Sequence, residues 1–367
     1  MGGRAEAPTT AVGAMGQCPV GRSPTPAPRG PSARVGPFLA LCVVVSVAAA
    51  CGGGTTPGAA RRTTTTTSTA AATTTTTTTV PSPWSRPSAP VDSVNPVTAL
   101  SCPTTTFCLA LNEADGAYRY DGTSWSPTIA VTPGQAPPTP AMAVVSCPSP
   151  TFCMAVPGGN DVSQWNGSSF SSDTLGGAQG LQALSCASSS FCVTVDGVGD
   201  AYFYEGRWSG AVNAWGGPSD ISCLTSDFCM ATAGGTAEWN GHSWSQPADV
   251  DTDGALDTVS CATTSFCVAA DTVGNVITWN GSSWSAPVSV DPAGSGSTVG
   301  DNEITAVSCA GTGFCAAVDS GGRAMVFDGT GWSKPTVIDT VPLAAVSCPT
   351  PTFCVALDKR GRSLTYR

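Results

Sequence analysis

Seven pairs of cysteines divide most of this chain into repeats. In every pair five residues separate the two cysteines, a Phe precedes the second one, and successive pairs begin 37 to 48 residues apart. A period near 40 residues predicts propeller blades or a solenoid. The pairs are Cys102 and Cys108, Cys147 and Cys153, Cys186 and Cys192, Cys223 and Cys229, Cys261 and Cys267, Cys309 and Cys315, and Cys348 and Cys354.

The cysteine spacing favours one disulfide per repeat and therefore an oxidising compartment. Seventeen cysteines accompany a single His, which does not fit zinc ligation by Cys-His sets. The competing interpretation is a set of redox-active or metal-binding thiols. Seven identical pairs meet a structural need that no single active site has, so we expect disulfides.

Each repeat is predicted to form four short strands. In the fifth repeat these cover 256–261, 266–270, 275–279 and 284–290, which we term strands A to D. Asn280-Gly281 is a strong hairpin signal between C and D. The aromatic residues that flank this turn, Trp279 and Trp284, are expected to pack on each other across the hairpin.

The last repeat ends at Tyr366-Arg367 without a strand D, and the missing strand is found at the other end of the domain. Residues 84–92 begin Trp-Ser and end in Asp, like the strand D segments 284–291 and 332–339. A ring can use such a strand to seal its last blade, whereas a linear solenoid cannot.

This arrangement resembles the closure of Trp-Asp-repeat propellers, and the turn followed by Trp loosely resembles the Asp-box of sialidase-type propellers. The sequence therefore predicts an all-β fold for residues 81–367. We expect a seven-bladed β-propeller of four-stranded blades, with the N-terminal strand closing the last blade and one disulfide in each blade.

Residues 1–50 have the outline of a signal peptide, with four arginines followed by the apolar run 38–50. That run is too short for a membrane-spanning helix. The small residues before Cys51 resemble the bacterial lipobox, which implies a lipidated Cys51 at the mature N-terminus. Plain secretion and a retained anchor are the alternatives. Residues 51–80 then form a Thr-rich disordered linker, glycosylated or bare, that tethers the propeller outside the cell membrane.

In a ring of this order the B-to-C turns and the D-to-A connectors share one face, which we term the connector face. Acidic or amide residues end strand B in five repeats, where they are expected to start the turn by accepting backbone N–H groups, and where they would make the rim negative. After Cys51, 24 acids oppose 11 bases, which disfavours nucleic acid or anionic lipid as a partner. The five residues are Asn112, Asp196, Asp271, Asp319 and Asp358.

One connector carries alternating carboxylates, Asp249, Asp251, Asp253 and Asp257, with a Gly between the last two. The pattern resembles the calcium loops of integrin alpha-chain propellers, and by that resemblance the four aspartates would ligate a structural Ca²⁺. An acidic turn cluster without metal is the alternative interpretation.

Two connectors are longer than the others, and long loops on a rigid ring are common places for recognition. We predict ligand contacts at Asp301 and Glu303, and also at Trp215, which lies outside the repeat pattern; for Trp215, simple loop packing is the alternative. The lone His242 lies in a C-to-D turn, so a Ser-His-Asp site has no credible base.

These features predict a monomeric, non-enzymatic binding or scaffold module for a protein or an envelope polysaccharide. The alternative is a sialidase-like or other glycoside-cleaving propeller in which Asp301 and Glu303 supply the carboxylates. A purely structural envelope protein is a third hypothesis.

Overall fold

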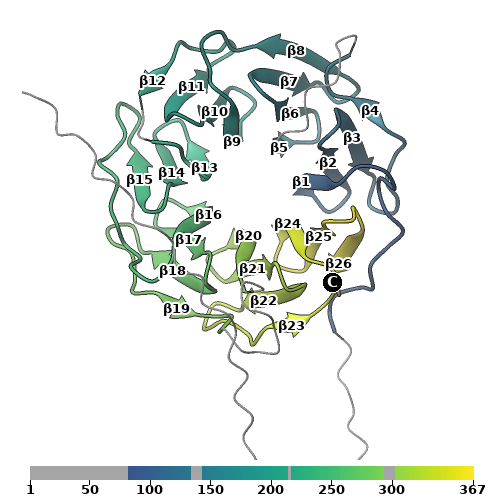
Figure 1. Ribbon diagram of the computed structural model, residues 1–367, viewed down its shortest axis with the longest axis vertical. Coiled ribbons are helices and arrows are strands. Elements are labelled where there is room, and N and C mark those ends of the chain that lie inside the picture. Colours follow the sequence, from purple (N-terminus) through teal and green to yellow (C-terminus); the bar gives the residue numbers. More distant parts are fainter. Residues whose placement is uncertain (1–81, 134–142, 214–215, 293–301) are drawn as a thin grey trace, which may run out of the picture. The chain divides into compact units, whose positions relative to one another are not determined.

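Seven antiparallel β-sheets form a closed ring around a central opening, as the computed structural model shows (Figure 1). The structure describes residues 82–133, 143–213, 216–292 and 302–367. Within these ranges, five sheets have four strands and two have three. The seven-bladed propeller predicted from the sequence is confirmed, whereas the predicted signal peptide, Cys51 and linker lie outside the described residues.

Strand A is the innermost strand of each blade and strand D the outermost (Figure 1). The A strands are β1 (Val97–Thr104), β5 (Val144–Ser149), β9 (Leu181–Ser188), β13 (Asp220–Thr225), β16 (Leu256–Thr263), β20 (Ile304–Gly311) and β24 (Leu343–Thr350). The B strands are β2 (Phe107–Asn112), β6 (Phe152–Gly158), β10 (Phe191–Asp196), β14 (Phe228–Thr232), β17 (Phe266–Asp271), β21 (Phe314–Asp319) and β25 (Phe353–Asp358).

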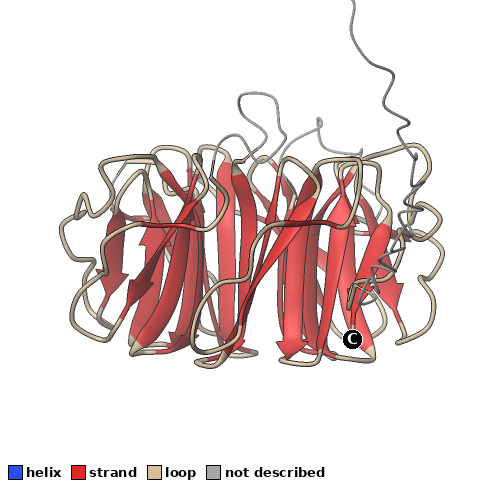
Figure 2. Cartoon of the chain, turned by 90° about the horizontal axis from the view of Figure 1, so that it is seen from below, coloured by secondary structure: helices blue, strands red, loops and turns tan. Residues whose placement is uncertain are grey.

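The C and D strands complete the outer half of the blades. The C strands are β3 (Gly116–Tyr120), β7 (Asp161–Trp165), β11 (Asp200–Tyr204), β15 (Thr236–Trp239), β18 (Asn275–Trp279), β22 (Arg323–Phe327) and β26 (Ser363–Tyr366). The D strands are β4 (Ile129–Ala130), β8 (Phe170–Thr174), β12 (Val212–Asn213), β19 (Val288–Ser289) and β23 (Thr336–Val337). Seen from the side, the strands run between two edges of the ring (Figure 2).

All seven predicted disulfides are present, and each joins strand A to strand B of one blade. The observed bonds are Cys102 to Cys108, Cys147 to Cys153, Cys186 to Cys192, Cys223 to Cys229, Cys261 to Cys267, Cys309 to Cys315 and Cys348 to Cys354. The prediction of one structural disulfide per blade is therefore confirmed, and these fourteen cysteines are not free thiols that could bind metal.

The hydrophobic core is a series of layers between blades. The B strands are buried almost throughout because both of their faces pack against neighbouring blades. One layer, for example, joins Leu109 and Leu111 of blade 1 to Trp165 and Phe170 of blade 2.

The D strands are shorter than predicted: of residues 284–290, only Val288 and Ser289 pair as a strand. Pro287 has no N–H and interrupts the ladder. The Ser after the aromatic residue replaces part of that pairing. Ser285 donates its backbone N–H to the Thr278 carbonyl at 2.9 Å, and its Oγ accepts the Thr278 N–H at 3.0 Å.

The N-terminal strand closes the ring through the same two contacts, as predicted. Ser85 donates its backbone N–H to the Thr365 carbonyl at 2.7 Å and accepts the Thr365 N–H on Oγ at 2.9 Å. Trp84 packs edge-on against Tyr366 with ring centroids 5.4 Å apart. The aromatic pairs of the other six blades pack across their hairpins at 5.2 to 5.7 Å, with tilted rings. Blade 7 therefore consists of β24 to β26 and the segment that begins at Trp84.

A belt of seven hydrogen bonds links the A strands around the opening. In each blade, the Ser before the first cysteine accepts on Oγ the N–H of the first cysteine of the next blade, at 2.9 to 3.0 Å. The bond from Cys102 to Ser347 joins blade 1 to blade 7 and completes the circle. Within the described ranges, no helix is long and apolar enough to cross a bilayer.

Candidate functional site

The polar residues that end strand B start the B-to-C turns, as predicted. In every case one side-chain oxygen accepts the backbone N–H groups two and four residues further on. Asp196, Asp271, Asp319 and Asp358 are fully buried, and Asn112 is only 3% exposed. These side chains therefore order the turns, and the charge of the rim comes from other residues.

A second set of aspartates follows strand D and lies at the junction with the next blade. We call them the junction aspartates: Asp92, Asp251, Asp291 and Asp339. Each follows the aromatic residue that opens its strand D segment by seven or eight positions. Because strand D of one blade leads directly to the next, each reaches the B-to-C turn of the following blade.

An arginine bridges two carboxylates at the junction between blades 5 and 6 (junction 5/6) and at the junction between blades 6 and 7 (junction 6/7). Arg323 Nε donates to Asp319 at 2.6 Å within its own blade, while its NH2 nitrogen lies 2.8 Å from junction aspartate Asp291. Arg362 bonds Asp358 and Asp339 in the same way, both at 2.6 Å. The two carboxylates raise the pKa of Arg362, chiefly through the Asp358 hydrogen bond. One guanidinium thus forms ion pairs with carboxylates from two blades.

At the junction 7/1 neutral donors take the place of arginine. Asp92 Oδ2 accepts hydrogen bonds from Asn112 Nδ2 and from the Tyr118 hydroxyl, both at 2.7 Å, and Oδ1 accepts the Val94 N–H at 2.8 Å. Burial alone would raise the pKa of Asp92, but these hydrogen bonds outweigh it and hold the pKa well below its usual range.

The junction 4/5 has neither a bridging arginine nor such a set of neutral donors among the described residues. Junction aspartate Asp251 is 4% exposed, and its Oδ1 accepts the Asp253 N–H at 2.9 Å, whereas its Oδ2 has no hydrogen-bond partner among the described residues. The neighbouring B-strand carboxylate, Asp271, accepts a hydrogen bond from Asn275 at 2.8 Å. Burial, and to a lesser extent the nearby Asp251, raises the pKa of Asp271.

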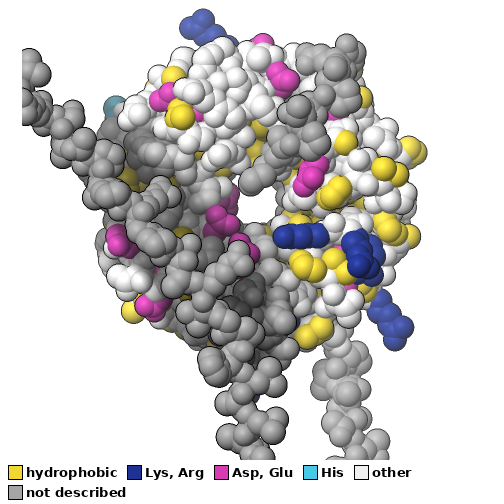
Figure 3. Space-filling view, viewed as in Figure 1, with side chains coloured by type: hydrophobic (Ala, Val, Ile, Leu, Met, Phe, Trp, Pro, Cys, Tyr) yellow, Lys and Arg dark blue, Asp and Glu magenta, His cyan; other side chains and the backbone are white. Residues whose placement is uncertain are grey.

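Charged side chains are unevenly distributed on the connector face. Figure 3 views this face: Lys and Arg side chains gather on one side of the opening, whereas acidic side chains lie beside the opening on the other side and also at further places around the ring. Asp249 and Asp253 are exposed in the connector before blade 5, and Lys359 and Arg360 are exposed in the B-to-C turn of blade 7. The connector face is therefore divided into sectors of opposite charge rather than uniformly negative.

Asp220, at the start of β13, is a partly exposed acid that links blade 4 to blade 5. Its Oδ2 accepts hydrogen bonds from the Val259 N–H at 2.9 Å and from the Thr258 hydroxyl at 3.1 Å. Burial, with a smaller contribution from the Asp257 charge, raises the pKa of Asp220 to about 6.

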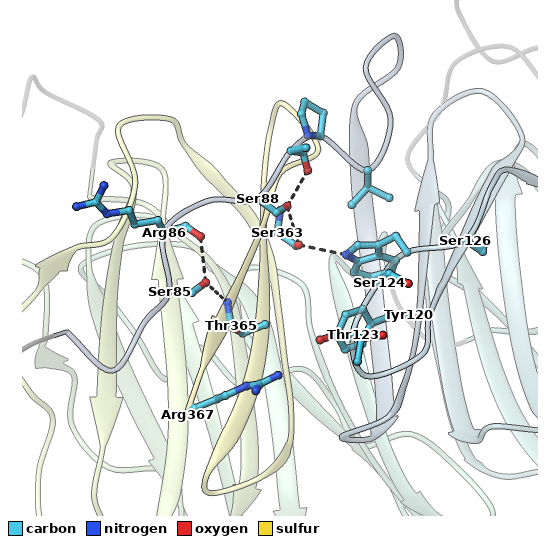
Figure 4. Close-up of a pocket in the computed structure, with 14 residues that line it drawn as sticks. Ser85, Arg86, Ser88, Tyr120, Thr123, Ser124, Ser126, Ser363, Thr365 and Arg367 are labelled. Carbon is cyan, nitrogen blue, oxygen red and sulfur yellow. Dashed lines mark hydrogen bonds between the residues drawn. The ribbon is translucent and has the colours of Figure 1, made fainter.

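A cleft of about 480 Å³ lies on the outer side of the ring, where the closing strand meets blade 1 (Figure 4). Trp125 forms part of its wall and donates its indole N–H to Ser363 Oγ at 3.1 Å. Arg86 and Arg367 line the cleft together with several Ser and Thr hydroxyl groups, and none of its lining residues is acidic. The cleft is suited to a polar or anionic group rather than to a cation.

A second cleft of about 280 Å³ occupies the same position between blades 2 and 3. Tyr204 and Trp208 line this second cleft at the positions that Tyr120 and Trp125 occupy in the first. The Tyr204 hydroxyl bonds Gln164 at 3.0 Å. The outer clefts thus follow from the repeat, and their polar lining differs from blade to blade.

The predicted site residues are dispersed. Trp215 and Asp301 lie outside the described residues. Glu303 is half-buried just before β20, where its backbone carbonyl accepts the Ser320 N–H at 2.9 Å. Across the described ranges, no group of three or more His, Cys, Asp or Glu residues is gathered as a metal site, and the calcium prediction for the 249–257 connector remains a prediction.

The comparisons with known proteins establish the fold. No protein-family model matches the sequence, and no curated protein sequence matches it. Among solved structures, "YCF48 bound to D1 peptide" aligns with a TM-score of 0.61 at 14% identity, over 78% of this chain and 98% of that one. "Crystal structure of RRP9 WD40 repeats" aligns with a TM-score of 0.64 at 10% identity, over 77% and 98%. The WD40 propeller domain of Doa1 aligns with a TM-score of 0.59 at 8% identity, over 77% and 97%.

Proposed function

We propose that this chain is a non-enzymatic binding module that holds a protein partner on its connector face. It works outside the cell membrane, attached through a lipid on Cys51 and the linker 51–80. One observation carries the proposal: the hairpin edge repeats the same disulfide-linked turn in seven blades, while the connector edge differs between blades in length and charge. Variation on one edge of a rigid ring is typical of a recognition surface.

The fold comparisons support a binding role. The similar structures include two WD40 propellers, and a third similar structure is YCF48 bound to a D1 peptide. The two charge sectors favour a polypeptide that carries both signs of charge, because electrostatic complementarity sets specificity and association rate. Asp249 and Asp253 would meet basic groups of the partner, and Lys359 and Arg360 would meet acidic ones.

The outer cleft favours a second candidate ligand, an envelope polysaccharide. The cleft presents hydroxyl groups, the edge of Trp125 and two arginines. Such groups bind sugar hydroxyls and sugar carboxylates. The cleft lies at the outer circumference, so this ligand would not compete with a protein on the connector face.

A capture experiment with charge-reversal variants tests the proposal. The chain is used to isolate partners from envelope extract, and the affinity of each purified partner is then measured. Glu303→Arg changes the connector face and is expected to weaken binding by tenfold or more, whereas the matched Glu205→Arg changes an exposed acid in a C-to-D turn and should not. Equal effects of the two substitutions would refute recognition by the connector face.

The same preparation separates binding from catalysis. Isolated envelope glycans are incubated with the chain and with Glu303→Gln, and released sugars are measured. The proposal predicts no release by either protein. Release that Glu303→Gln abolishes would replace the binding module with a glycoside-cleaving enzyme.

A further inference from the structure

The junction 4/5 contains two carboxylates where the next two junctions have a complete ion triad. Asp251 corresponds to Asp291 and Asp339, because each follows its Trp by seven residues. Asp271 corresponds to Asp319 and Asp358, because all three end strand B and accept the same two backbone N–H groups.

The missing component is the cation. The position eight residues after the second cysteine is Arg323 in blade 6 and Arg362 in blade 7, but Asn275 in blade 5. Asn275 donates one hydrogen bond to Asp271 and carries no charge. Among the described residues, neither Asp251 nor Asp271 has a Lys or Arg within ion-pair distance.

The unbalanced charge is deeply buried. Asp271 is fully buried and Asp251 is 4% exposed, and Asp251 Oδ2 has no hydrogen-bond partner in the described part of the chain. An unpaired buried carboxylate costs several kcal/mol, so such groups are paired with a donor, bind a metal or take up a proton. Asn275 is also shorter than arginine, and its side chain donates a hydrogen bond to Asp271.

The connector packs tightly over this site. A Cβ added at Gly254 would lie 2.5 Å from Asp271 Oδ2, so the backbone after Asp251 passes directly over the second carboxylate. The Asp253 N–H fixes one oxygen of Asp251 at 2.9 Å, which leaves the other oxygen free for a ligand.

We propose that a divalent cation of the Ca²⁺ or Mg²⁺ class binds between Asp251 and Asp271 and replaces the arginine of the neighbouring junctions. Hard divalent cations take carboxylate oxygens and complete their coordination with water. Two carboxylates match a charge of two. The cation fastens blade 4 to blade 5 and orders the connector that forms the acidic sector.

This site differs from the loop predicted from the sequence, which would use Asp249, Asp251, Asp253 and Asp257. Asp249 and Asp253 are exposed, and Asp257 is half-buried on β16. Asp251 is common to both, whereas Asp271, from the next blade, belongs only to the junction site. The two sites therefore predict different effects for substitutions at Asp253 and Asp271.

The test is thermal unfolding of the chelator-treated chain, with and without Ca²⁺ or Mg²⁺ at constant ionic strength. The proposal predicts a saturable rise in Tm on the order of 5 °C for at least one of the two cations. Asp251→Asn and Asp271→Asn should abolish the rise, and the matched Asp253→Asn should retain it. Calorimetric titration should find one site per chain in the parent and none in Asp251→Asn.

A repeat-swap variant gives an independent result that does not rely on a loss of stability. Asn275→Arg restores the arginine of blades 6 and 7, and we expect it to be at least as stable as the cation-loaded parent and insensitive to added cation. An unchanged Tm of the parent chain in both Ca²⁺ and Mg²⁺ would overturn the proposal. That result is expected if Asp251 and Asp271 share a proton instead of binding a cation. Loss of the rise in Asp253→Asn, or its persistence in Asn275→Arg, would also overturn it.

Discussion

Removal of the Trp84 side chain should destabilise the propeller more than removal of any equivalent Trp. Trp84 is 7% exposed and packs in the layer between blades 6 and 7, in contact with Tyr366. Trp284 holds the same place in blade 5 but is only half-buried. Truncation of a buried Trp to Ala costs about 3–5 kcal/mol. We expect about 4 kcal/mol for Trp84→Ala and about 1–2 kcal/mol for Trp284→Ala.

The position of Trp84 in the ring explains the difference. Its loss creates a cavity and also weakens the segment that holds the two chain ends together, whereas Trp284 is held by a continuous hairpin. Equilibrium urea unfolding of both variants gives the two free energies, and calorimetry should show Tm lower by on the order of 8 °C for Trp84→Ala. If Trp84→Ala costs no more than Trp284→Ala, the closing strand does not contribute as described.

Three further predictions concern charge, crosslinks and turns. The folded-state pKa of Asp220, about 6, exceeds its unfolded value, so the native state keeps a proton that the unfolded state loses and stability falls as pH rises from about 4 to 6. Asp220→Asn should reduce this fall in the free energy of unfolding by roughly 2 kcal/mol, after allowance for the partial exposure of Asp220. Unfolding curves measured at a series of pH values give the slope, and an unchanged slope would assign the fall to other groups. Replacing Cys186 and Cys192 together by Ser should cost about 2.4 kcal/mol by the loop-entropy relation, and a loss under roughly 0.5 kcal/mol in urea unfolding would contradict it. Gly274→Ala places a Cβ against the Asp291 carbonyl at a φ of 91°, so a loss of about 2 kcal/mol or more is expected, whereas Gly331→Ala meets nothing within 4 Å and should be nearly neutral; equal Tm values for the two would refute this.

The sequence was sufficient to predict the ring because each blade repeats its strong local signals. The Cys pairs and the Asn-Gly or Asp-Gly turns marked the hairpins, and Trp84-Ser85 revealed the closing strand. The predicted strand D is too long because the sequence pattern does not separate Trp284 from the short strand that follows Pro287. Pro287 prevents that pairing, and the Ser285 side chain supplies a hydrogen bond instead.

The contacts between blades could not be predicted from the sequence. The Ser before each first cysteine recurs in all seven repeats, but its acceptor role joins residues about 40 positions apart in different blades. Arg323 and Asp291 are likewise 32 positions apart and belong to different blades. An alignment of the repeats against one another indicates which junctions have an arginine, because it places Asn275 in the same column as Arg323 and Arg362.

The outer clefts could not be predicted, because they depend on the sizes of side chains at strand edges. Trp125 and Ser363 are 238 residues apart, and their hydrogen bond exists only because the ring is closed. Ring closure thus determines both the stability of the domain and the shape of its first cleft.

The most direct test of ring closure is an engineered disulfide between the closing strand and the last C strand. The Oγ atoms of Ser88 and Ser363 lie 2.9 Å apart, so cysteines at these positions are close enough to bond once the ring is closed. The Ser88→Cys/Ser363→Cys variant is expected to form this crosslink within a monomer, detected by mass spectrometry of non-reduced peptides. Two free thiols in the folded protein, or a crosslink found only between chains, would contradict the closed ring.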